Sequence, residues 1–138
     1  MAHCLIVDDS RVIRTVARRI FEDLHFITGE AEDGMSALRA AREKMPDLIL
    51  LDWSMPGMTG LEIVRSLRAQ PDGGRPLILV CTTEVDAGEI AHAVAAGIDD
   101  YIMKPFDRET LSAKLAELHT HRANAAPAAA LQSATAGP

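Results

Sequence analysis

Cysteine is scarce in this chain, and long apolar runs are missing. The 138 residues include two cysteines, Cys4 and Cys81, each inside a short apolar stretch, where a thiol usually behaves as a small buried hydrophobic group. Two such residues make no disulfide framework. No apolar run approaches the roughly 18 residues of a membrane helix, and the first residues lack the features of a signal peptide. We therefore expect a soluble, cytoplasmic protein without membrane insertion.

Basic residues are too few and too scattered to form a surface for nucleic acid. The chain has 14 Lys and Arg against 20 Asp and Glu, which gives a formal net charge of −6 at pH 7. Binding to a phosphate backbone needs a stripe or cluster of basic side chains. Four arginines do lie close together in residues 11–19, and we interpret them as the solvated side of a helix. Direct binding of nucleic acid is not expected.

Four short apolar runs are present, and each one ends in polar residues. The runs are Cys4–Val7, Leu48–Leu51, Leu77–Cys81 and Tyr101–Met103. Each is too short for a helix but suits a buried parallel strand. They are followed, in order, by Asp8-Asp9, Asp52, Thr82-Thr83 and Lys104-Pro105. If the strands are parallel in one sheet, all these polar residues meet at one edge, where open α/β folds bind their ligands.

Segments with helical spacing of apolar residues separate these strands. After a possible cap at Ser10, a stripe is formed by Ile13, Val16, Ala17, Ile20 and Leu24. A second strand is expected at Phe26–Ala31, with a turn at Glu32-Asp33-Gly34. Two further helices are predicted at Met35–Lys44 and at Asp86–Ala96, the second one ended by Gly97. Another should follow the capping box at Thr59–Glu62 and bury Leu61, Val64 and Leu67. The last is predicted from Asp107 to about Arg122. This alternation predicts an α/β fold with a parallel sheet and helices on both faces.

The chain length suits one domain, which we assign to residues 1–122. The last 16 residues, 123–138, are half alanine and carry no charged side chain. Such a segment offers little apolar surface to offset the entropy of ordering. We expect a disordered Ala/Pro-rich tail.

The acids at the predicted sheet edge favour phosphoryl-transfer chemistry. Asp8, Asp9 and Asp52 would repel one another without a counter-charge, and oxygen ligands of this kind suit Mg²⁺, which leaves room for a phosphate. Lys104 and the hydroxyl of Thr82 can bind phosphoryl oxygens. Asp52, the lone acid, is the best candidate nucleophile, because carboxylates can form aspartyl-phosphates.

The same residues resemble the receiver domain of bacterial two-component response regulators. The resemblance rests on Val7-Asp8-Asp9-Ser10, the run from Leu51 to Gly57, Thr82, and Tyr101–Phe106, and it covers about residues 3–120. It is strongest to the single-domain, CheY-like members of chemotaxis. It implies a flavodoxin-like (βα)5 fold, a doubly wound five-stranded parallel sheet in the order 2-1-3-4-5.

The resemblance also implies a role for each residue. Asp52 would accept a phosphoryl group from a phosphohistidine of a sensor histidine kinase or from a small donor. Mg²⁺ would be bound by Asp8, Asp9, Asp52 and the backbone carbonyl of Ser54. Lys104 would pair with the phosphoryl group, and the Lys104-Pro105 peptide bond would be cis.

A switch is implied as well. Thr82 would move toward the phosphoryl group and Tyr101 would turn inward, which would reshape the face made by the fourth helix, the last strand and the last helix. Ser54 replaces the amide side chain of CheY two residues after the nucleophile, and Glu84 lies at the other position that tunes dephosphorylation.

We expect a monomeric signalling protein that assists its own phosphorylation and dephosphorylation and is not otherwise an enzyme. Its output partner would be a protein such as the flagellar motor switch. Two alternatives within this class are a relay intermediate and a phosphate sink, each exchanging phosphoryl groups with a histidine phosphotransferase. A binding module independent of phosphorylation is a further alternative. A phosphatase would need an acid where Ser54 stands, and a flavodoxin-like ligand binder would need phosphate-cradling loops in place of the acids.

Overall fold

The computed structural model describes residues 2–120. These residues fall into two compact units, one that ends at Phe106 and one that begins at Asp107. The first unit holds the sheet and four helices, and the second holds a helix over residues 108–120. The predicted tail at 123–138 lies outside the described residues.

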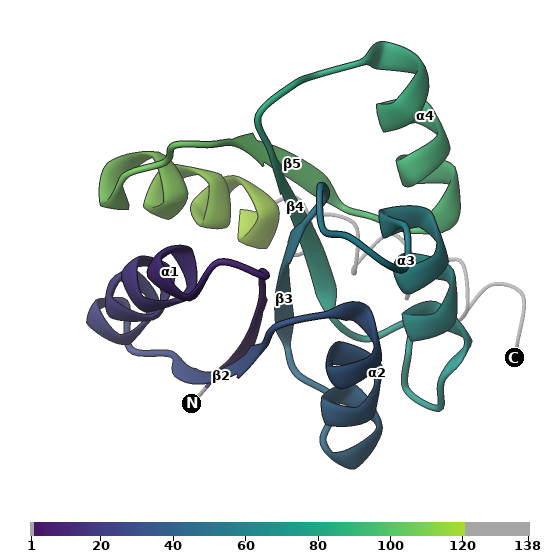
Figure 1. Ribbon diagram of the computed structural model, residues 1–138. Coiled ribbons are helices and arrows are strands. Elements are labelled where there is room, and N and C mark those ends of the chain that lie inside the picture. The colour runs from purple at the N-terminus through teal and green to yellow at the C-terminus, as the bar shows by residue number, and fades with distance from the viewer. Residues whose placement is uncertain (1, 121–138) are drawn as a thin grey trace, which may run out of the picture. The chain divides into compact units, whose positions relative to one another are not determined.

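A parallel five-stranded sheet forms the centre of the first unit, and its strand order is β2-β1-β3-β4-β5 (Figure 1). The strands are β1 (His3–Val7), β2 (Ile27–Ala31), β3 (Leu48–Asp52), β4 (Leu77–Thr82) and β5 (Asp100–Met103). The expected flavodoxin-like order is confirmed. Each predicted strand is present, and its ends lie within one residue of the prediction.

Helices cover both faces of this sheet. They are α1 (Arg11–Asp23), α2 (Gly34–Glu43), α3 (Gly60–Ala69) and α4 (Ala87–Ala96). Helix α1 lies on one face, and α2, α3 and α4 lie side by side on the other (Figure 1). Alternate strand residues point to the three-helix face, and those that join its core are Leu5, Val7, Ile49, Leu51, Ile78 and Val80. Strands β1, β3 and β4 are buried along almost their whole length, which explains why they read as continuous apolar runs.

Helix caps fix where the chain leaves the sheet edge. The Ser10 hydroxyl accepts a hydrogen bond from the Ile13 N–H at 3.3 Å and caps α1. Thr59 and Glu62 form the predicted capping box at the start of α3. Gly97 ends α4 with a φ of +122°, a conformation that favours glycine.

Two predictions about buried helix residues are wrong in detail. The predicted turn at Glu32-Asp33-Gly34 does separate β2 from α2, with Asp33 as the N-cap of α2 and Gly34 as its first residue. Val16 is 45% exposed, and Phe21 takes its place in the buried stripe of α1, because Val16 lies at the edge of the face centred on Ala17. In α3, Ile63 is buried where Leu61 was expected.

The helix over residues 108–120 begins as the sequence predicts. The Asp107 carboxylate accepts a hydrogen bond from the Thr110 N–H at 2.8 Å, and the Leu111 N–H donates to the Asp107 carbonyl. Asp107 is therefore its N-cap. Among residues 2–120, the helices are all too short or too polar to cross a bilayer.

Candidate functional site

Asp8, Asp52 and Lys104 meet at the carboxyl ends of the central strands. Asp52 is the last residue of β3, Asp8 follows β1, and Lys104 follows β5. The Lys104 Nζ lies 2.8 Å from Asp8 Oδ2 and 3.1 Å from Asp52 Oδ1. The two acids are only 2% and 4% exposed. Buried carboxylates need charged partners, and the ammonium that bridges them supplies one.

Backbone N–H groups hold both carboxylates in place. The Ser10 N–H donates to Asp8 Oδ1 at 2.9 Å, and the Ser54 N–H donates to Asp52 Oδ1 at 3.2 Å. The loop after β3 is tied to the neighbouring strand by the Trp53 N–H, which donates to the Cys81 carbonyl at 3.0 Å. The acids are therefore oriented by the main chain as well as by Lys104.

Burial and charge act in opposite directions on the site. Burial raises the pKa of Asp52 above its ordinary value, although hydrogen bonds from Ser54 and Lys104 work against this rise. Burial alone would lower the pKa of Lys104, but its contacts with Asp8 and Asp52 outweigh burial and raise that pKa. Lys104 is therefore an ammonium near neutral pH, and burial makes the ionised form of Asp52 less favourable than it is in water.

Other residues assigned from the sequence lie around this centre. Asp9 is exposed, and its carboxylate is not among the groups clustered with Asp8 and Asp52. The Thr82 hydroxyl is buried and donates to the Glu84 carbonyl at 2.8 Å, while the Glu84 side chain is exposed. Ser54 is also exposed.

The remaining two assignments concern β5 and the turn that follows it. Tyr101 is half-buried against the three-helix core. The Lys104-Pro105 peptide bond is cis, the isomer that the resemblance implied, and the Lys104 N–H donates to the Thr82 carbonyl at 2.8 Å. This bond extends the pairing of β4 with β5 by one residue and sets where the Lys104 side chain begins.

The donor set fits a hard divalent cation. Oxygens of Asp8 and Asp52 and the sulfur of Cys81 lie within 4.8 Å of one another. Burial raises the pKa of the Cys81 thiol to about 12, so it stays protonated and is a poor ligand near neutral pH. Two carboxylates remain, which is what Mg²⁺ typically takes from a protein while it keeps water and leaves space for a phosphate.

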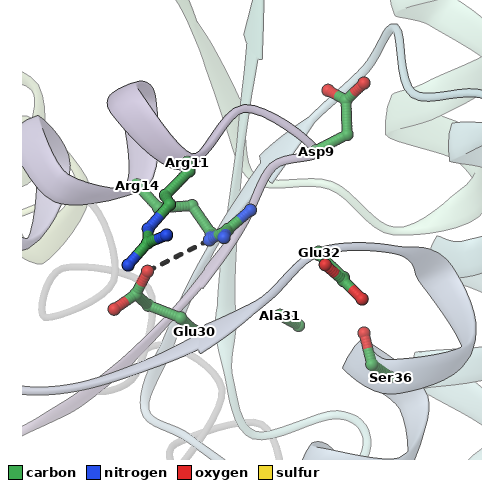
Figure 2. A pocket seen from close by; sticks show the side chains of 7 residues that line it. All are labelled: Asp9, Arg11, Arg14, Glu30, Ala31, Glu32 and Ser36. Atoms are coloured by element: carbon green, nitrogen blue, oxygen red, sulfur yellow. Dashed lines mark hydrogen bonds and ion pairs between the residues drawn. The ribbon is translucent and has the colours of Figure 1, made fainter.

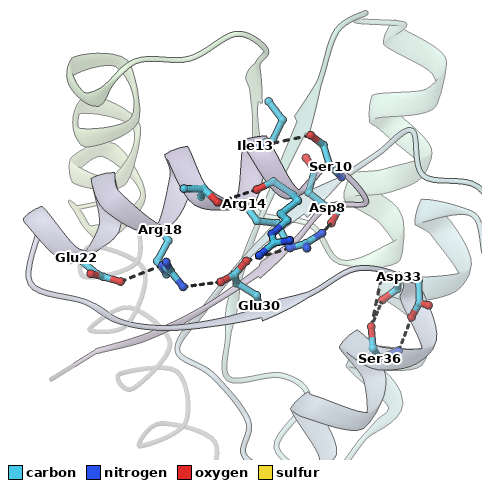
Figure 3. A network of polar contacts seen from close by, with 11 residues as sticks. Asp8, Ser10, Ile13, Arg14, Arg18, Glu22, Glu30, Asp33 and Ser36 are labelled. Carbon is cyan, nitrogen blue, oxygen red and sulfur yellow. Dashed lines mark hydrogen bonds and ion pairs between the residues drawn. The ribbon is translucent and has the colours of Figure 1, made fainter.

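An ionic network beside the acids was missed by the sequence analysis. Figure 3 shows Arg14 between the main chain at Asp8 and the carboxylate of Glu30, with Arg18 and Glu22 continuing the chain of contacts. The Arg14 side chain is only 14% exposed, so the interpretation of this arginine as part of a solvated face is wrong. The available signal was the place of Arg14 in the first turn after Ser10, close to the predicted acid edge.

Comparisons with known proteins agree with this geometry. Residues 4–116 match the family described as the response regulator receiver domain. The chain is 38% identical over 112 residues to the chemotaxis protein CheY-3 of Vibrio cholerae, an alignment that covers 80% of this chain and 86% of that protein.

Solved structures have the same fold. Chemotaxis protein CheY4 of Vibrio cholerae matches with a TM-score of 0.82 and 36% identity, over 86% of this chain and 98% of that one. The receiver domain of sensor histidine kinase PA1611 of Pseudomonas aeruginosa, which has magnesium coordinated in its active-site cleft, matches with a TM-score of 0.76 and 32% identity, over 85% and 96%. With its acid pair at the ends of two central strands and its lysine after the fifth, this chain belongs to the response regulator receiver domain family of two-component systems.

Proposed function

We propose that the chain is a phosphoacceptor of a two-component phosphorelay and that Asp52 carries the phosphoryl group. The observation that supports this most strongly is the Lys104 ammonium in contact with both Asp8 and Asp52. Phosphoryl transfer depends on positioning and on neutralising negative charge, and this centre supplies a fixed cation beside a fixed carboxylate. The phosphoryl group ends on the protein, so we propose an acceptor and not an enzyme that turns over an external substrate.

The transfer begins at the free electron pairs of the Asp52 carboxylate. One carboxylate oxygen attacks the phosphorus of a phosphohistidine on a sensor histidine kinase or histidine phosphotransferase. The phosphorus–nitrogen bond breaks, and its electron pair stays with the imidazole. The product is an acyl phosphate on Asp52, which water later hydrolyses. Ser54 and Glu84, both exposed beside the site, are placed to influence how water reaches it.

The residues around Asp52 would neutralise the negative charge of the phosphoryl group. Asp8, Asp9 and Asp52, with the Ser54 carbonyl, would bind Mg²⁺, which supplies neutralisation of the phosphoryl oxygens. Lys104 is the protein's own cation at the site and is placed to follow the phosphoryl group when its contact with the Asp52 carboxylate is lost. The magnesium in the PA1611 receiver domain supports the same assignment here.

The new charge then biases a switch. The Thr82 hydroxyl exchanges its bond to the Glu84 carbonyl for one to a phosphoryl oxygen, and Tyr101 moves further into the three-helix core. Helix α4 buries one residue, Ala93, and is therefore weakly anchored and able to respond. The likeness to CheY-3 and CheY4 supports a chemotaxis pathway with an output protein such as the flagellar motor switch.

The fluorescence of Trp53 tests this function, because Trp53 is the only tryptophan and is next to Asp52. MgCl₂ is added first and acetyl phosphate second, to the wild type and to Asp52→Asn. We expect a Mg²⁺-dependent change in the wild type, then a second change driven by the phosphodonor. The second change should be absent from Asp52→Asn.

The two additions separate two parts of the proposal. A wild type that responds to Mg²⁺ but not to acetyl phosphate, or to any other small phosphodonor, would overturn the acceptor role of Asp52 and leave the metal site standing. A wild type that responds to neither would contradict both and would favour a binding module independent of phosphorylation.

A further inference from the structure

A hollow of about 660 Å³ lies beside the loop that carries Asp8 and Asp9, called the acid loop below, between the β1–α1 and β2–α2 connections. It is lined by Asp9, Arg11, Arg14, Glu30, Ala31, Glu32 and Ser36 (Figure 2). Arg14 and Glu30 face each other across part of it, and Asp9 points away from that pair (Figure 2). The side chain of Arg14 also reaches the main chain of Asp8.

The pairing of β1 with β2 stops just before the acids. Val7 and Ala31 are the last partners in the register, and the Asp8 N–H still donates to the Ala31 carbonyl at 3.1 Å. The Asp8 carbonyl lies beyond this ladder, on a residue that is 2% exposed. A buried carbonyl needs a donor, and the Arg14 Nη1–H supplies it at 2.7 Å.

Arg14 reaches this carbonyl because of its place in α1. Its own N–H donates to the carbonyl of the N-cap Ser10, and helical side chains lean toward the N-terminus of their helix. The guanidinium is then held from the other side by Glu30, whose Oε1 lies 3.0 Å from the Arg14 Nε. One planar group thus joins the acid loop to the edge strand β2.

We propose that Arg14 is a positioning residue for the Mg²⁺ site, holding the loop that carries Asp8 and Asp9 in a conformation able to bind the cation. This role rests on the function proposed above. Mg²⁺ demands near-ideal octahedral geometry, so small displacements of its carboxylate ligands weaken binding. Arg14 contacts no ligand oxygen of Asp8, whose two carboxylate oxygens are bonded to Ser10 and Lys104, and acts through the main chain alone.

Arg18 provides a matched control for this role. Like Arg14, it lies in α1 and forms an ion pair with Glu30, at 2.9 Å, but its second ion pair is with Glu22 and it does not contact Asp8. A role of Arg14 in fold stability alone would make the two arginines similar in their effect on Mg²⁺. A positioning role makes them differ.

The experiment measures the dissociation constant of Mg²⁺ from Trp53 fluorescence, and the thermal midpoint without Mg²⁺, in wild type, Arg14→Met and Arg18→Met. We expect the dissociation constant to rise about tenfold in Arg14→Met, as is typical when a group supporting a metal ligand is removed. It should stay within about twofold of wild type in Arg18→Met. Arg14→Lys, which keeps the charge but lacks the planar fork, should recover only part of the loss.

Each contrary outcome has its own meaning. If Arg14→Met binds Mg²⁺ as tightly as the wild type, or if Arg18→Met loses as much Mg²⁺ affinity as Arg14→Met, the positioning role is overturned and the metal site stands. A wild type that does not respond to Mg²⁺ would overturn the site itself, and the role with it. If Arg14→Met does not fold, Glu30→Gln replaces it. This change removes the carboxylate charge that holds the guanidinium toward β2, and an unchanged Mg²⁺ affinity there would also overturn the role.

Discussion

Lys104 stabilises two buried carboxylates that would otherwise repel each other. Its ammonium is within 3.1 Å of both Asp8 and Asp52, and no more than 4% of either acid is exposed. Because the pKa of Lys104 is raised in the folded state, the charge that joins them is present at neutral pH and is lost only as the pH rises through that raised value. The site is therefore held together by Lys104, the same residue that we propose to pair with the phosphoryl group.

Replacing Lys104 by methionine should therefore destabilise the protein in Mg²⁺-free buffer. We expect a loss of about 3 kcal/mol in the free energy of unfolding, the scale found when one partner of a buried ion pair is removed. Added Mg²⁺ should restore part of the loss, because the cation neutralises the same carboxylates. Urea denaturation measures both. Lys44→Met, at an exposed lysine, is the control and should stay within about 0.5 kcal/mol of wild type.

Asp52→Asn should have the opposite effect on stability. Burial raises the pKa of Asp52, so the folded state binds its proton more tightly than the unfolded state. At pH values above the pKa of Asp52 in the folded protein, the carboxylate charge lowers the free energy of unfolding. This destabilisation decreases as the pH falls through that pKa. We expect Asp52→Asn to be more stable than wild type at pH 7 without Mg²⁺. The difference should shrink in denaturation curves taken at lower pH, and a difference that grows would contradict this account.

At the scale of elements, the turn from β3 to α3 places Trp53 against the start of α3. A Cβ atom added to Gly60, the first residue of that helix, would lie 2.3 Å from the Trp53 ring. No real Cβ contact is that short, so the glycine is what lets the ring occupy its half-buried position beside Asp52. The start of α3 and the Trp53 ring, whose fluorescence is used to follow the site, thus pack against each other.

Gly60→Ala tests this packing. Alanine is the better helix former, but the clash should dominate and lower the free energy of unfolding by about 1–3 kcal/mol. The emission of Trp53 should change as the ring is displaced. Gly74→Ala is the matched control, because its Cβ would meet no atom within 4 Å, and it should leave both stability and emission unchanged. Thermal unfolding followed by tryptophan fluorescence gives both readings, and equal effects of the two variants would refute the assigned packing.

Element types were predictable because strand and helix signals here are strong and local. The capping box at Thr59–Glu62 and the glycine at Gly97 define helix ends by their own chemistry. Burial along a helix was less predictable, because it depends on which way the helix turns over the sheet. Val16 and Phe21 illustrate this, since both fit an apolar stripe and only Phe21 is buried.

At the scale of the whole molecule, the meeting of Asp8, Asp52 and Lys104 was predictable because parallel strands bring their carboxyl ends to one edge. Side-chain conformations there were not. The Thr82 hydroxyl points toward the loop that follows it, because it donates to the Glu84 carbonyl. Asp9 is exposed. Neither conformation follows from the spacing of residues in the sequence. The contact of Arg14 with the Asp8 carbonyl also escaped prediction, because it depends on where α1 leaves the edge.

The central claim is that Asp52 is the residue that takes the phosphoryl group. The most direct test is the intact mass of the protein after incubation with Mg²⁺ and phosphoramidate, a donor with the phosphorus–nitrogen bond of phosphohistidine. We predict that the wild type gains the mass of one phosphoryl group and that Asp52→Asn gains none. A phosphoryl group on Asp52→Asn, or none on a folded wild type, would contradict the account.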